Sequence, residues 1–539
     1  MSSVINKSRY SRRAFLGILG AGLTSSLLAG HRKVKVTRPN IIFLLTDDQR
    51  AGTLGASGHP FIKTPNLDKL TSDGVRFSNA FIAEPVCSPS RVSLFTGQYE
   101  RVHGIGFSSS YDLSEKQWEN TYPALLQKDG YYTGFVGKFG VEYYTFRGNA
   151  KSKFDFWKAR DGWARFFPKG KGKGSIYNDC KEEIITPITG ECIDQFLDST
   201  PGEKPFCLSV SFSAPHGCIS GSMFPGESGN TRMTNPANEN PKLKDHPVYG
   251  NLYRDKGVKI PDECTGDPYK HIPIEVLDQD DGRNITYSYN YNRDTCLEHH
   301  FRYYQLITGI DKVVGELRAS LKKRGLSDNT IIIYSSDHGL LMGEYGMGGK
   351  ALLYDLTTKI PLIIYDPRLP KNKRGKVVDE LVSSIDITST IMKYAGAEVP
   401  AAMQGKSLID LMKYQDMPWR DHIFLESLFV WRGNPFIEGV RTKDWKYLRY
   451  FKFEGKSNGD HYRDHYLEKD ADFAGKEPVF EQLFNLKNDP TEKTNLIDNP
   501  EYDSILEDLR VKCEKESQKM VNIRKRMDKK TKGNLDAMY

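Results

Sequence analysis

Four short apolar runs in this chain lead directly into ionisable side chains, and this pattern constrains the fold more than any other feature. The runs span residues 40–45, 131–136, 206–212 and 331–336. Their short length and continuous apolar character predict buried strands of an α/β sheet. Ligand sites in open α/β sheets form at the carboxyl ends of the strands. We therefore expect the ionisable residues that follow these runs to share one pocket.

The residues at the ends of the runs are of types that bind metals or transfer protons. They are Asp47 and Asp48 after the first run, Lys138 after the second, His216 after the third, and Asp337 with His338 after the fourth. The three aspartates predict a hard divalent ion, calcium or magnesium, since neither cysteine pairs nor histidine clusters accompany them. The alternative is that these carboxylates only cap helices or pair with lysines, and their shared position at strand ends favours the metal.

Residues 87–97, CSPSRVSLFTG, predict a short helix with a cysteine at its amino-terminal end. Ser88 or Ser90 can cap this helix. Cys87 would then lie at the positive end of the helix dipole, and Arg91, one turn later, could reach the same anion. This arrangement predicts that a negatively charged group binds at Cys87. The alternative is a buried free cysteine, which is the usual environment of a lone cysteine.

The same eleven residues match the signature C-x-P-S-R-x4-T-G at every fixed position, and through it the chain resembles the type I sulfatases of the alkaline phosphatase superfamily. In that family a maturation enzyme oxidises the cysteine, here Cys87, to formylglycine, and the hydrated aldehyde is the nucleophile. His338 stands where many relatives have asparagine, which leaves the identity of the metal more open. The resemblance implies a calcium ion with these ligands: Asp47, Asp48, the modified Cys87, Asp337 and His338.

The resemblance also implies roles for three cations and one histidine. Arg91, Lys138 and Lys350 would surround the sulfate group, because ester cleavage moves negative charge onto its oxygens. His216 ends an Ala-Pro-His sequence and would donate a proton to the leaving alcohol. The alternatives are that either lysine is a solvated surface group and that His216 is a packed neutral ring.

One position departs from the family pattern. Many relatives carry a histidine two residues after the lysine that corresponds to Lys138, and this chain has Gly140 there. In those relatives the histidine is thought to take the proton whose removal releases sulfate, and a glycine cannot exchange protons. His103 and Asp337 are the candidate replacements, and His103 is also the candidate substrate-binding residue. His103 could equally be an ordinary loop residue.

Residues 1–30 are typical of a twin-arginine export signal. Arg12 and Arg13 precede a short apolar run that ends in small residues. A membrane anchor is the less favoured alternative because the run is short, and a lipoprotein would need cysteine where His31 stands. The leader therefore predicts a bacterial protein of the periplasm or one that is secreted. No later apolar run is long enough to span a bilayer, so no stable membrane span is expected.

The mature chain is expected to fold as an α/β protein with two parts. Residues 36–415 would form the catalytic domain, a large mixed β-sheet flanked by helices as in alkaline phosphatase. Residues 416–539 would form a smaller C-terminal α+β subdomain with an antiparallel sheet. The expected elements of that subdomain are strands at 439–442, 445–450 and 482–486 and a helix near 501–520.

Charge and cysteine content exclude some classes of function. The net charge of +7 is mild and compatible with an anionic substrate, and the chain lacks the interleaved aromatic and basic residues that would indicate nucleic-acid binding. Its eight cysteines form no close C-x-x-C pairs, which argues against a zinc cluster. If Cys87 is modified, the remaining cysteines are odd in number, and one or two disulfides are possible in an exported protein.

The sequence therefore predicts an exported sulfatase that hydrolyses sulfate monoesters, with a sulfated carbohydrate or polysaccharide as substrate. Its expected partners are this substrate and the formylglycine-generating maturation enzyme. The first alternative is a phosphodiesterase or phosphonate monoester hydrolase on the same scaffold. The second is a non-catalytic polyanion-binding protein, in which Cys87 would stay unmodified.

Overall fold

In the computed structural model, all of the residues described below belong to one unit, Arg38–Tyr539. The predicted export signal, residues 1–30, lies outside the described residues. Within the described part of the chain, no helix is both long and apolar enough to cross a membrane. The described residues are 38–107, 113–141, 150–160, 162, 164–224, 227, 245–265, 268–277, 290, 292–414, 417–430, 434–452 and 471–535.

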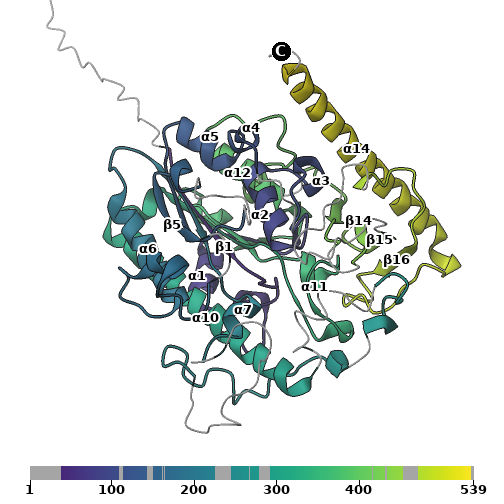
Figure 1. The fold of residues 1–539 in the computed structure, drawn as a ribbon, viewed down its shortest axis with the longest axis horizontal. Helices are drawn as coiled ribbons and strands as arrows, with labels where there is room; N and C mark the ends of the chain where they lie inside the picture. Colours follow the sequence, from purple (N-terminus) through teal and green to yellow (C-terminus); the bar gives the residue numbers. More distant parts are fainter. Residues whose placement is uncertain are drawn as a thin grey trace, which may run out of the picture. The chain divides into compact units, whose positions relative to one another are not determined.

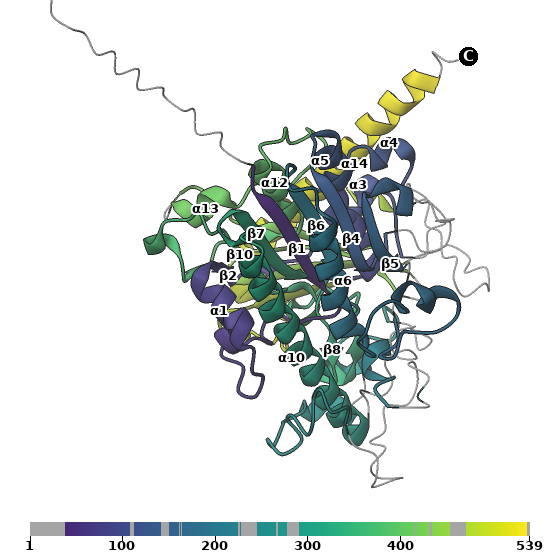
Figure 2. The same cartoon turned by 90° about the vertical axis from the view of Figure 1, so that its left-hand side faces the viewer.

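The largest element of the unit is an eight-stranded mixed sheet (Figure 2). Its strands are β1 (Asn40–Thr46), β2 (Val75–Phe77), β4 (Tyr132–Lys138), β5 (Phe156–Arg160), β6 (Phe206–Ser211), β7 (Thr330–Ser336), β10 (Leu362–Tyr365) and β11 (Lys376–Val378). They lie in the order β11-β2-β10-β7-β1-β6-β4-β5. β1 is parallel to both β6 and β7, and β10 is antiparallel to β7. The four predicted runs are thus the adjacent strands β7, β1, β6 and β4, and the predicted α/β fold is confirmed.

Helices cover both faces of this sheet (Figure 1). One face carries α1 (Pro65–Asp73), α6 (Ile185–Ser199) and α10 (Arg293–Lys323), and the other carries α2 (Cys87–Thr96), α5 (Tyr122–Lys128) and α12 (Ile385–Tyr394). Ile42 and Leu44 of β1 belong to the apolar core under the first set, whereas Ile41 and Phe43 belong to the core under the second. The alternation of side chains along one buried strand therefore fills two separate cores.

Helix α2 begins at Cys87, as the sequence predicts, but its predicted cap is wrong. Val86 is the N-cap residue, and no side chain caps the helix. Ser90 instead donates its hydroxyl to the backbone oxygen of Asp337 at 2.7 Å. All ten residues of α2 are buried, and the helix packs against α3 (Glu100–His103), α5 and α12. The serine thus ties the helix to the end of β7 rather than to its own first turn.

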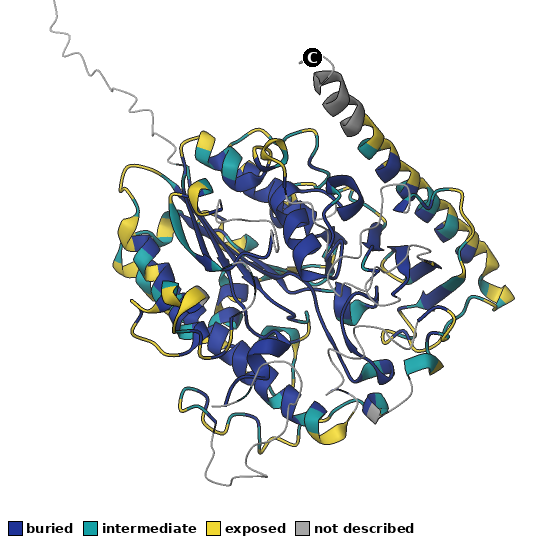
Figure 3. Cartoon of the chain, viewed as in Figure 1, coloured by how far each residue is buried: buried dark blue, intermediate teal, exposed yellow. Residues whose placement is uncertain are grey.

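A second, antiparallel sheet forms the C-terminal part, as predicted. Its strands, in order, are β13 (Ile423–Ser427), β14 (Phe436–Arg441), β15 (Trp445–Phe451) and β16 (Phe480–Asn485), and α14 (Asp503–Leu535) packs on it. Figure 3 shows buried and exposed segments alternating along α14. Leu506, Leu509 and Cys513 are buried at helical spacing, as expected for a helix with one apolar face. The helix extends beyond residue 520, where the prediction ended it, and β13 was not predicted.

Short elements at the carboxyl edge of the large sheet carry further candidate residues. The strand pair β8 (Leu341–Met342) and β9 (Gly348–Gly349) precedes Lys350, and α7 (Gly217–Ser220) follows His216 directly. The other short elements are β3 (Ala80–Phe81), β12 (Val382–Ser383), α3 (Glu100–His103), α4 (Glu115–Trp118), α11 (Asp355–Thr358) and α13 (Ile409–Lys413).

Candidate active site

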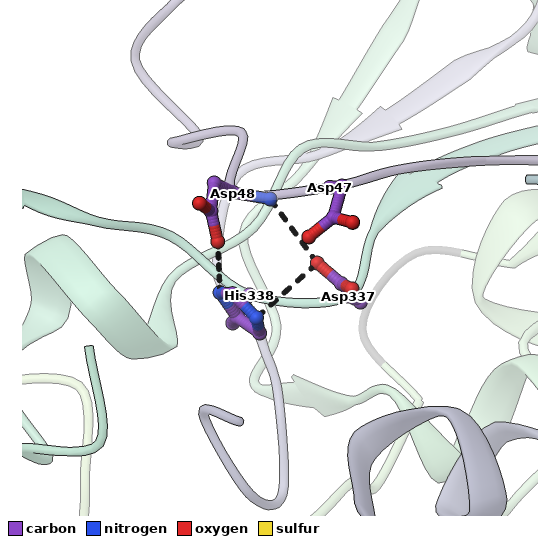
Figure 4. Close-up of side chains that lie close together, drawn as sticks. All are labelled: Asp47, Asp48, Asp337 and His338. Carbon is purple, nitrogen blue, oxygen red and sulfur yellow. Dashed lines mark hydrogen bonds and ion pairs between the residues drawn. The ribbon is translucent and has the colours of Figure 1, made fainter. Parts of the chain in front are cut away.

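Four predicted ligands meet at the ends of two neighbouring strands. Asp47 and Asp48 follow β1, and Asp337 and His338 follow β7, its parallel neighbour. All four side chains are fully buried, and one ligand atom from each lies within 4.8 Å of the others. Figure 4 shows them facing one another, with the backbone N–H of Asp48 donating to Asp337 Oδ1 at 3.2 Å. The register of two parallel strands thus brings distant parts of the sequence into one group.

The chemistry of this group fits a metal cation. His338 Nδ1 lies 2.9 Å from the backbone oxygen of Gly339, which can only accept, so Nδ1 carries the proton and Nε2 is an acceptor. Nε2 lies 3.5 Å from Asp337 Oδ1, another acceptor, and two facing acceptors repel without a cation between them. Three buried atoms in the described group lack a hydrogen-bond partner: Asp47 Oδ1, Asp48 Oδ2 and His338 Nε2. Orphaned acceptors in a buried site are expected where a metal binds.

The carboxylates differ in how their surroundings affect proton binding. Burial raises the pKa of Asp48 to about 7, although the adjacent Lys350 opposes this effect. Burial also raises the pKa of Asp337. The pKa of Asp47 lies well below its ordinary value, because the cations around it, Lys138 first, outweigh the cost of burial. Asp47 is therefore held ionised by its neighbours even before a cation binds.

Three cations neutralise the three carboxylates. Lys138 Nζ lies 2.5 Å from Asp47 Oδ2, and Lys350 Nζ lies 2.9 Å from Asp48 Oδ1. Arg91 Nη2 lies 2.8 Å from Asp337 Oδ2 and 3.5 Å from Asp47 Oδ2. Since the charges of these six side chains cancel, a bound divalent ion would leave the site positive. Such a site favours an anionic substrate.

Cys87 lies at the amino-terminal end of α2, and only 6% of it is exposed. Its thiol interacts electrostatically with Arg91 and Lys138, the two cations that also contact Asp47. Arg91 is held in place by the backbone oxygen of Lys138 at 2.9 Å and by the hydroxyl of Ser211. The same two cations, Arg91 and Lys138, therefore interact with Cys87 and with the carboxylate group.

His216 extends the group from the end of β6. Its Nδ1 accepts the backbone N–H of Cys218 at 3.1 Å, so the neutral ring carries its proton on Nε2. Nε2 lies 3.8 Å from Asp48 Oδ2. Burial lowers the pKa of His216 well below its ordinary value. The ring thus presents an N–H donor toward the carboxylate group.

His103 lies at the end of α3, and its ring contacts α2. Its Nε2 is 3.1 Å from the hydroxyl of Ser93, and its Nδ1 accepts the backbone N–H of Ile105 at 3.1 Å. Burial lowers its pKa to about 3, which makes the ring neutral. None of its contacts with described residues joins it to Asp47, Asp48, Asp337 or His338. Its contacts hold α3 against α2, while its predicted role toward substrate stays a prediction.

Gly140 is shaped by Arg91. Its φ of +63° lies in the left-handed region, and a Cβ atom there would lie 2.9 Å from Arg91 Cδ. A histidine at this position would be strained by its backbone and would displace the arginine. Arg91 therefore occupies the space beside position 140 that the side chain of the family's histidine would need.

Two contributors to the site were not predicted. Ser211 is the last residue of β6 and bonds to Arg91, and the strand-end pattern could have indicated it. Tyr303 of α10 donates its hydroxyl to the backbone oxygen of Asp48 at 2.8 Å and accepts the N–H of Arg50 at 2.9 Å. No local signal in the sequence distinguishes Tyr303 from the other apolar-face residues of its helix.

The comparison with family models covers most of the chain. Residues 39–397 match the model described as Sulfatase. Residues 343–472 match the C-terminal region of N-sulphoglucosamine sulphohydrolase, and residues 425–537 match the C-terminal region of aryl-sulfatase. The first match alone includes every predicted ligand and the signature at residues 87–97.

Curated relatives and solved structures agree with these matches. An arylsulfatase of Clostridium perfringens is 29% identical over 509 residues, covering 88% of this chain and 93% of that protein. An N-acetylglucosamine-6-O-sulfatase of Bacteroides thetaiotaomicron is 26% identical, covering 89% and 87%. A structure described as a 2-O GAG sulfatase has a TM-score of 0.66 at 23% identity, covering 90% and 92%, which shows a shared fold. The chain therefore belongs to the sulfatase family of the alkaline phosphatase superfamily and is a sulfuric ester hydrolase.

Proposed function

We propose that the chain is an exported sulfatase that removes sulfate from a sulfated carbohydrate or polysaccharide, with a formylglycine made from Cys87 and a bound calcium ion. The observation that carries this proposal is the set of facing, unpartnered acceptors on Asp47, Asp48 and His338. The cations next to this set also interact with Cys87. The predicted leader supports export, and a maturation enzyme would have to supply the formylglycine.

The roles of the side chains follow from their positions. When bound, calcium would supply Lewis-acid polarisation and the formylglycine hydrate would supply the nucleophilic oxygen. Arg91, Lys138 and Lys350 would hold the sulfuryl oxygens and stabilise the negative charge that develops there. His216 would donate a proton to the leaving oxygen in its imidazolium form, which the negative charge of a bound sulfate ester would favour over the neutral ring. Calcium fits better than zinc because three of the four ligands are carboxylates.

A carbohydrate substrate is supported by the relatives. The Bacteroides thetaiotaomicron protein is named as an N-acetylglucosamine-6-O-sulfatase. Residues 343–472 match the family model described as the C-terminal region of N-sulphoglucosamine sulphohydrolase. An exported enzyme would meet sulfated polysaccharides outside the cytoplasm, which agrees with this class of substrate.

The proposal is tested by mass spectrometry and turnover. The Cys87 peptide of protein from its native host is expected to show the mass loss that accompanies conversion of CH2SH to CHO. Wild-type protein is expected to cleave an aryl sulfate faster than the matching aryl phosphate and to release sulfate from a sulfated polysaccharide. Cys87→Ala, which keeps the fold, serves as the inactive control. An unmodified peptide in active protein, or faster turnover of the phosphate, contradicts the proposal.

A further inference from the structure

A cavity of about 450 Å³ lies beside the candidate active site but is lined by other residues. Its walls come from the loop after β1, from α10 and α11, and from the turn between β14 and β15 of the second sheet. None of the predicted metal ligands, and none of the predicted catalytic residues, lines it. Figure 1 shows α11 between the large sheet and the strands β14 to β16. The volume is in the usual range for a small-molecule site.

The cavity wall is cationic. Arg50, Lys359, Arg441 and Lys443 line it, against the single carboxylate of Asp355. Three of these cations already have acidic partners. Arg50 bonds to both oxygens of Glu344 at 2.8 Å, Arg441 pairs with Asp355 at 3.0 Å, and Lys443 pairs with Glu380 at 3.3 Å.

Lys359 is the exception. No carboxylate among the described residues lies within ion-pair distance of its Nζ, and its nearest recorded contact is the ring of Phe81, 5.7 Å from Nζ to the centroid. Burial lowers the pKa of Lys359; the charge of Asp355 opposes this effect, and the cations Arg441, Lys446 and Arg76 add to it. A half-buried ammonium without a carboxylate in ion-pair contact is a cost to the fold. Such a cost is expected where a group serves a ligand.

Aromatic rings also line the cavity. The rings of Tyr304 and His59 meet edge to face, with centroids 5.0 Å apart. His59 accepts two backbone N–H groups, and burial lowers its pKa to about 4, so its ring is neutral. A cavity that combines flat apolar ring surfaces with a cation suits a sugar that carries an anionic group. Tyr303, also in this wall, bonds to the backbone of Asp48, so the cavity and the metal group share a structural element.

We propose that this cavity is a second anion-binding site, in which Lys359 binds a sulfate or carboxylate group on a further sugar unit of the substrate. The inference rests on the proposed carbohydrate function and extends it. An enzyme with such a site prefers chains that carry more than one anionic group. Lys359 contributes to substrate binding, and its contribution should appear in KM for long substrates.

The test compares three substrates with the mature holoenzyme. They are an aryl sulfate, a tetrasaccharide with a single sulfate at the cleaved position, and the same tetrasaccharide with additional sulfates, taken from the polysaccharide that wild type desulfates. Lys359→Met removes the charge and keeps the length of the side chain. Lys371→Met, at an exposed lysine that does not line the cavity, is the matched control for net charge.

Wild type is expected to have a higher kcat/KM for the multiply sulfated tetrasaccharide than for the singly sulfated one. Lys359→Met is expected to lower this ratio about tenfold by raising KM, because the variant loses one charged hydrogen bond to the substrate. Lys371→Met is expected to leave the ratio unchanged. A uronate-bearing tetrasaccharide with one sulfate distinguishes a carboxylate ligand from a sulfate ligand. If Lys359→Met lowers kcat/KM for neither the multiply sulfated nor the uronate-bearing tetrasaccharide, relative to the singly sulfated one, the inference is overturned. Absent turnover of every tetrasaccharide, with the aryl sulfate still cleaved, overturns the carbohydrate function instead.

A stability measurement checks that Lys359→Met is folded. Because burial disfavours the Lys359 ammonium and no carboxylate among the described residues pairs with it, Lys359→Met is expected to have a thermal midpoint at least equal to that of wild type. A crystal of wild type soaked in selenate is expected to show anomalous selenium density next to Lys359 Nζ, and the same soak of Lys359→Met to show none. Selenate density at the metal group alone contradicts the inference.

Discussion

Metal binding by Asp47, Asp48, Asp337 and His338 depends on which nitrogen of the His338 ring carries the proton. Because His338 Nδ1 donates to the backbone of Gly339, Nε2 faces the carboxylates as a lone pair. The ring therefore acts as a neutral ligand, and burial lowers its pKa well below the ordinary value, which keeps it so. A side-chain amide oxygen could serve the same purpose without the constraint on protonation.

Replacement of His338 by asparagine is expected to retain the metal, whereas replacement by leucine is expected to lose it. Asparagine offers an oxygen to a hard cation, and leucine offers no ligand. After chelation, adding calcium should raise the thermal midpoint of wild type and of His338→Asn much more than that of His338→Leu. Saturation at a thousand times Kd is worth about 4 kcal/mol. A wild-type midpoint that does not respond to calcium would count against the metal.

Gly140 supports Arg91 by leaving space for it. Gly140→Ala is expected to cost about 1–2 kcal/mol through its left-handed backbone and to lower kcat about tenfold or more by moving the guanidinium. Gly58→Ala is the matched control, since Gly58 has a φ of +83° with no atom within 4 Å of the added Cβ. Urea unfolding and aryl sulfate turnover measure the two effects. Equal activity in both variants would exclude the steric role.

Most of the site could be predicted at this scale because its residues sit in short sequence patterns. The signature around Cys87 and the aspartates after β1 and β7 are local features, and the structure brings them together as the parallel register requires. Tyr303 could not be found in this way, since its contact with Asp48 depends on how a long helix lies against the sheet. The space that Arg91 takes beside Gly140 is likewise a product of packing.

Elements that join the two sheets determine how the C-terminal part is attached. Arg101 of α3 is buried and reaches Glu438 of β14 at 2.6 Å, Glu426 of β13 at 3.3 Å and Ser517 of α14 at 3.0 Å. One side chain from the catalytic part therefore meets three elements of the other part. Two of its partners, Glu426 and Glu438, are buried acids, and the positive charge of Arg101 compensates their negative charge.

Arg101→Met is expected to destabilise the protein by about 3–5 kcal/mol, because it leaves Glu426 and Glu438 buried with less compensation. Lys69→Met breaks only the exposed pair with Asp73, 2.6 Å apart, and is expected to cost less than about 1 kcal/mol. Urea unfolding followed by circular dichroism measures both. Similar costs for the two variants would show that Arg101 does not anchor the second sheet.

The central strands were predictable because they are buried on both faces and read as uninterrupted apolar runs. The short and outer strands were harder. β11 and β2 are three residues long, and β13 contains Glu426, a buried acid that pairs with Arg101. The end of α14 was also missed, because its last turns are rich in charge and contain only two apolar residues beyond residue 523, Met527 and Leu535. Short or charged elements depend on their partners and leave little trace in local sequence.

For the whole molecule, the predicted boundary near residue 415 does not coincide with a gap between cores. One apolar cluster combines Tyr99 and Ile385 of the catalytic part with Phe424 and Tyr447 of the second sheet and Leu509 of α14. The division of the chain into residues 36–415 and 416–539 remains a prediction from the sequence. The shared cluster indicates that the two parts depend on each other for stability.

The described unit is therefore expected to unfold in one transition. Calorimetry of the mature chain should show a single peak, and a chain that ends after residue 414 should fail to fold, because it exposes the apolar cluster that the second sheet covers. Binding of a dye that reports exposed apolar surface measures the second effect. Two resolved transitions, or a cooperatively folded truncated chain, would contradict the expectation.

The enclosure of α2 also orders events in biosynthesis. Every residue of this helix is buried, and Ser90 is bonded to the segment after β7, which is made more than two hundred residues later. A second protein can take the Cys87 thiol into its own catalytic centre only while that later strand is not yet in place. If Cys87 is converted to formylglycine as proposed, its oxidation has to compete with translation and folding, and the yield of working enzyme then depends on the speed of a partner rather than on the stability of the finished protein.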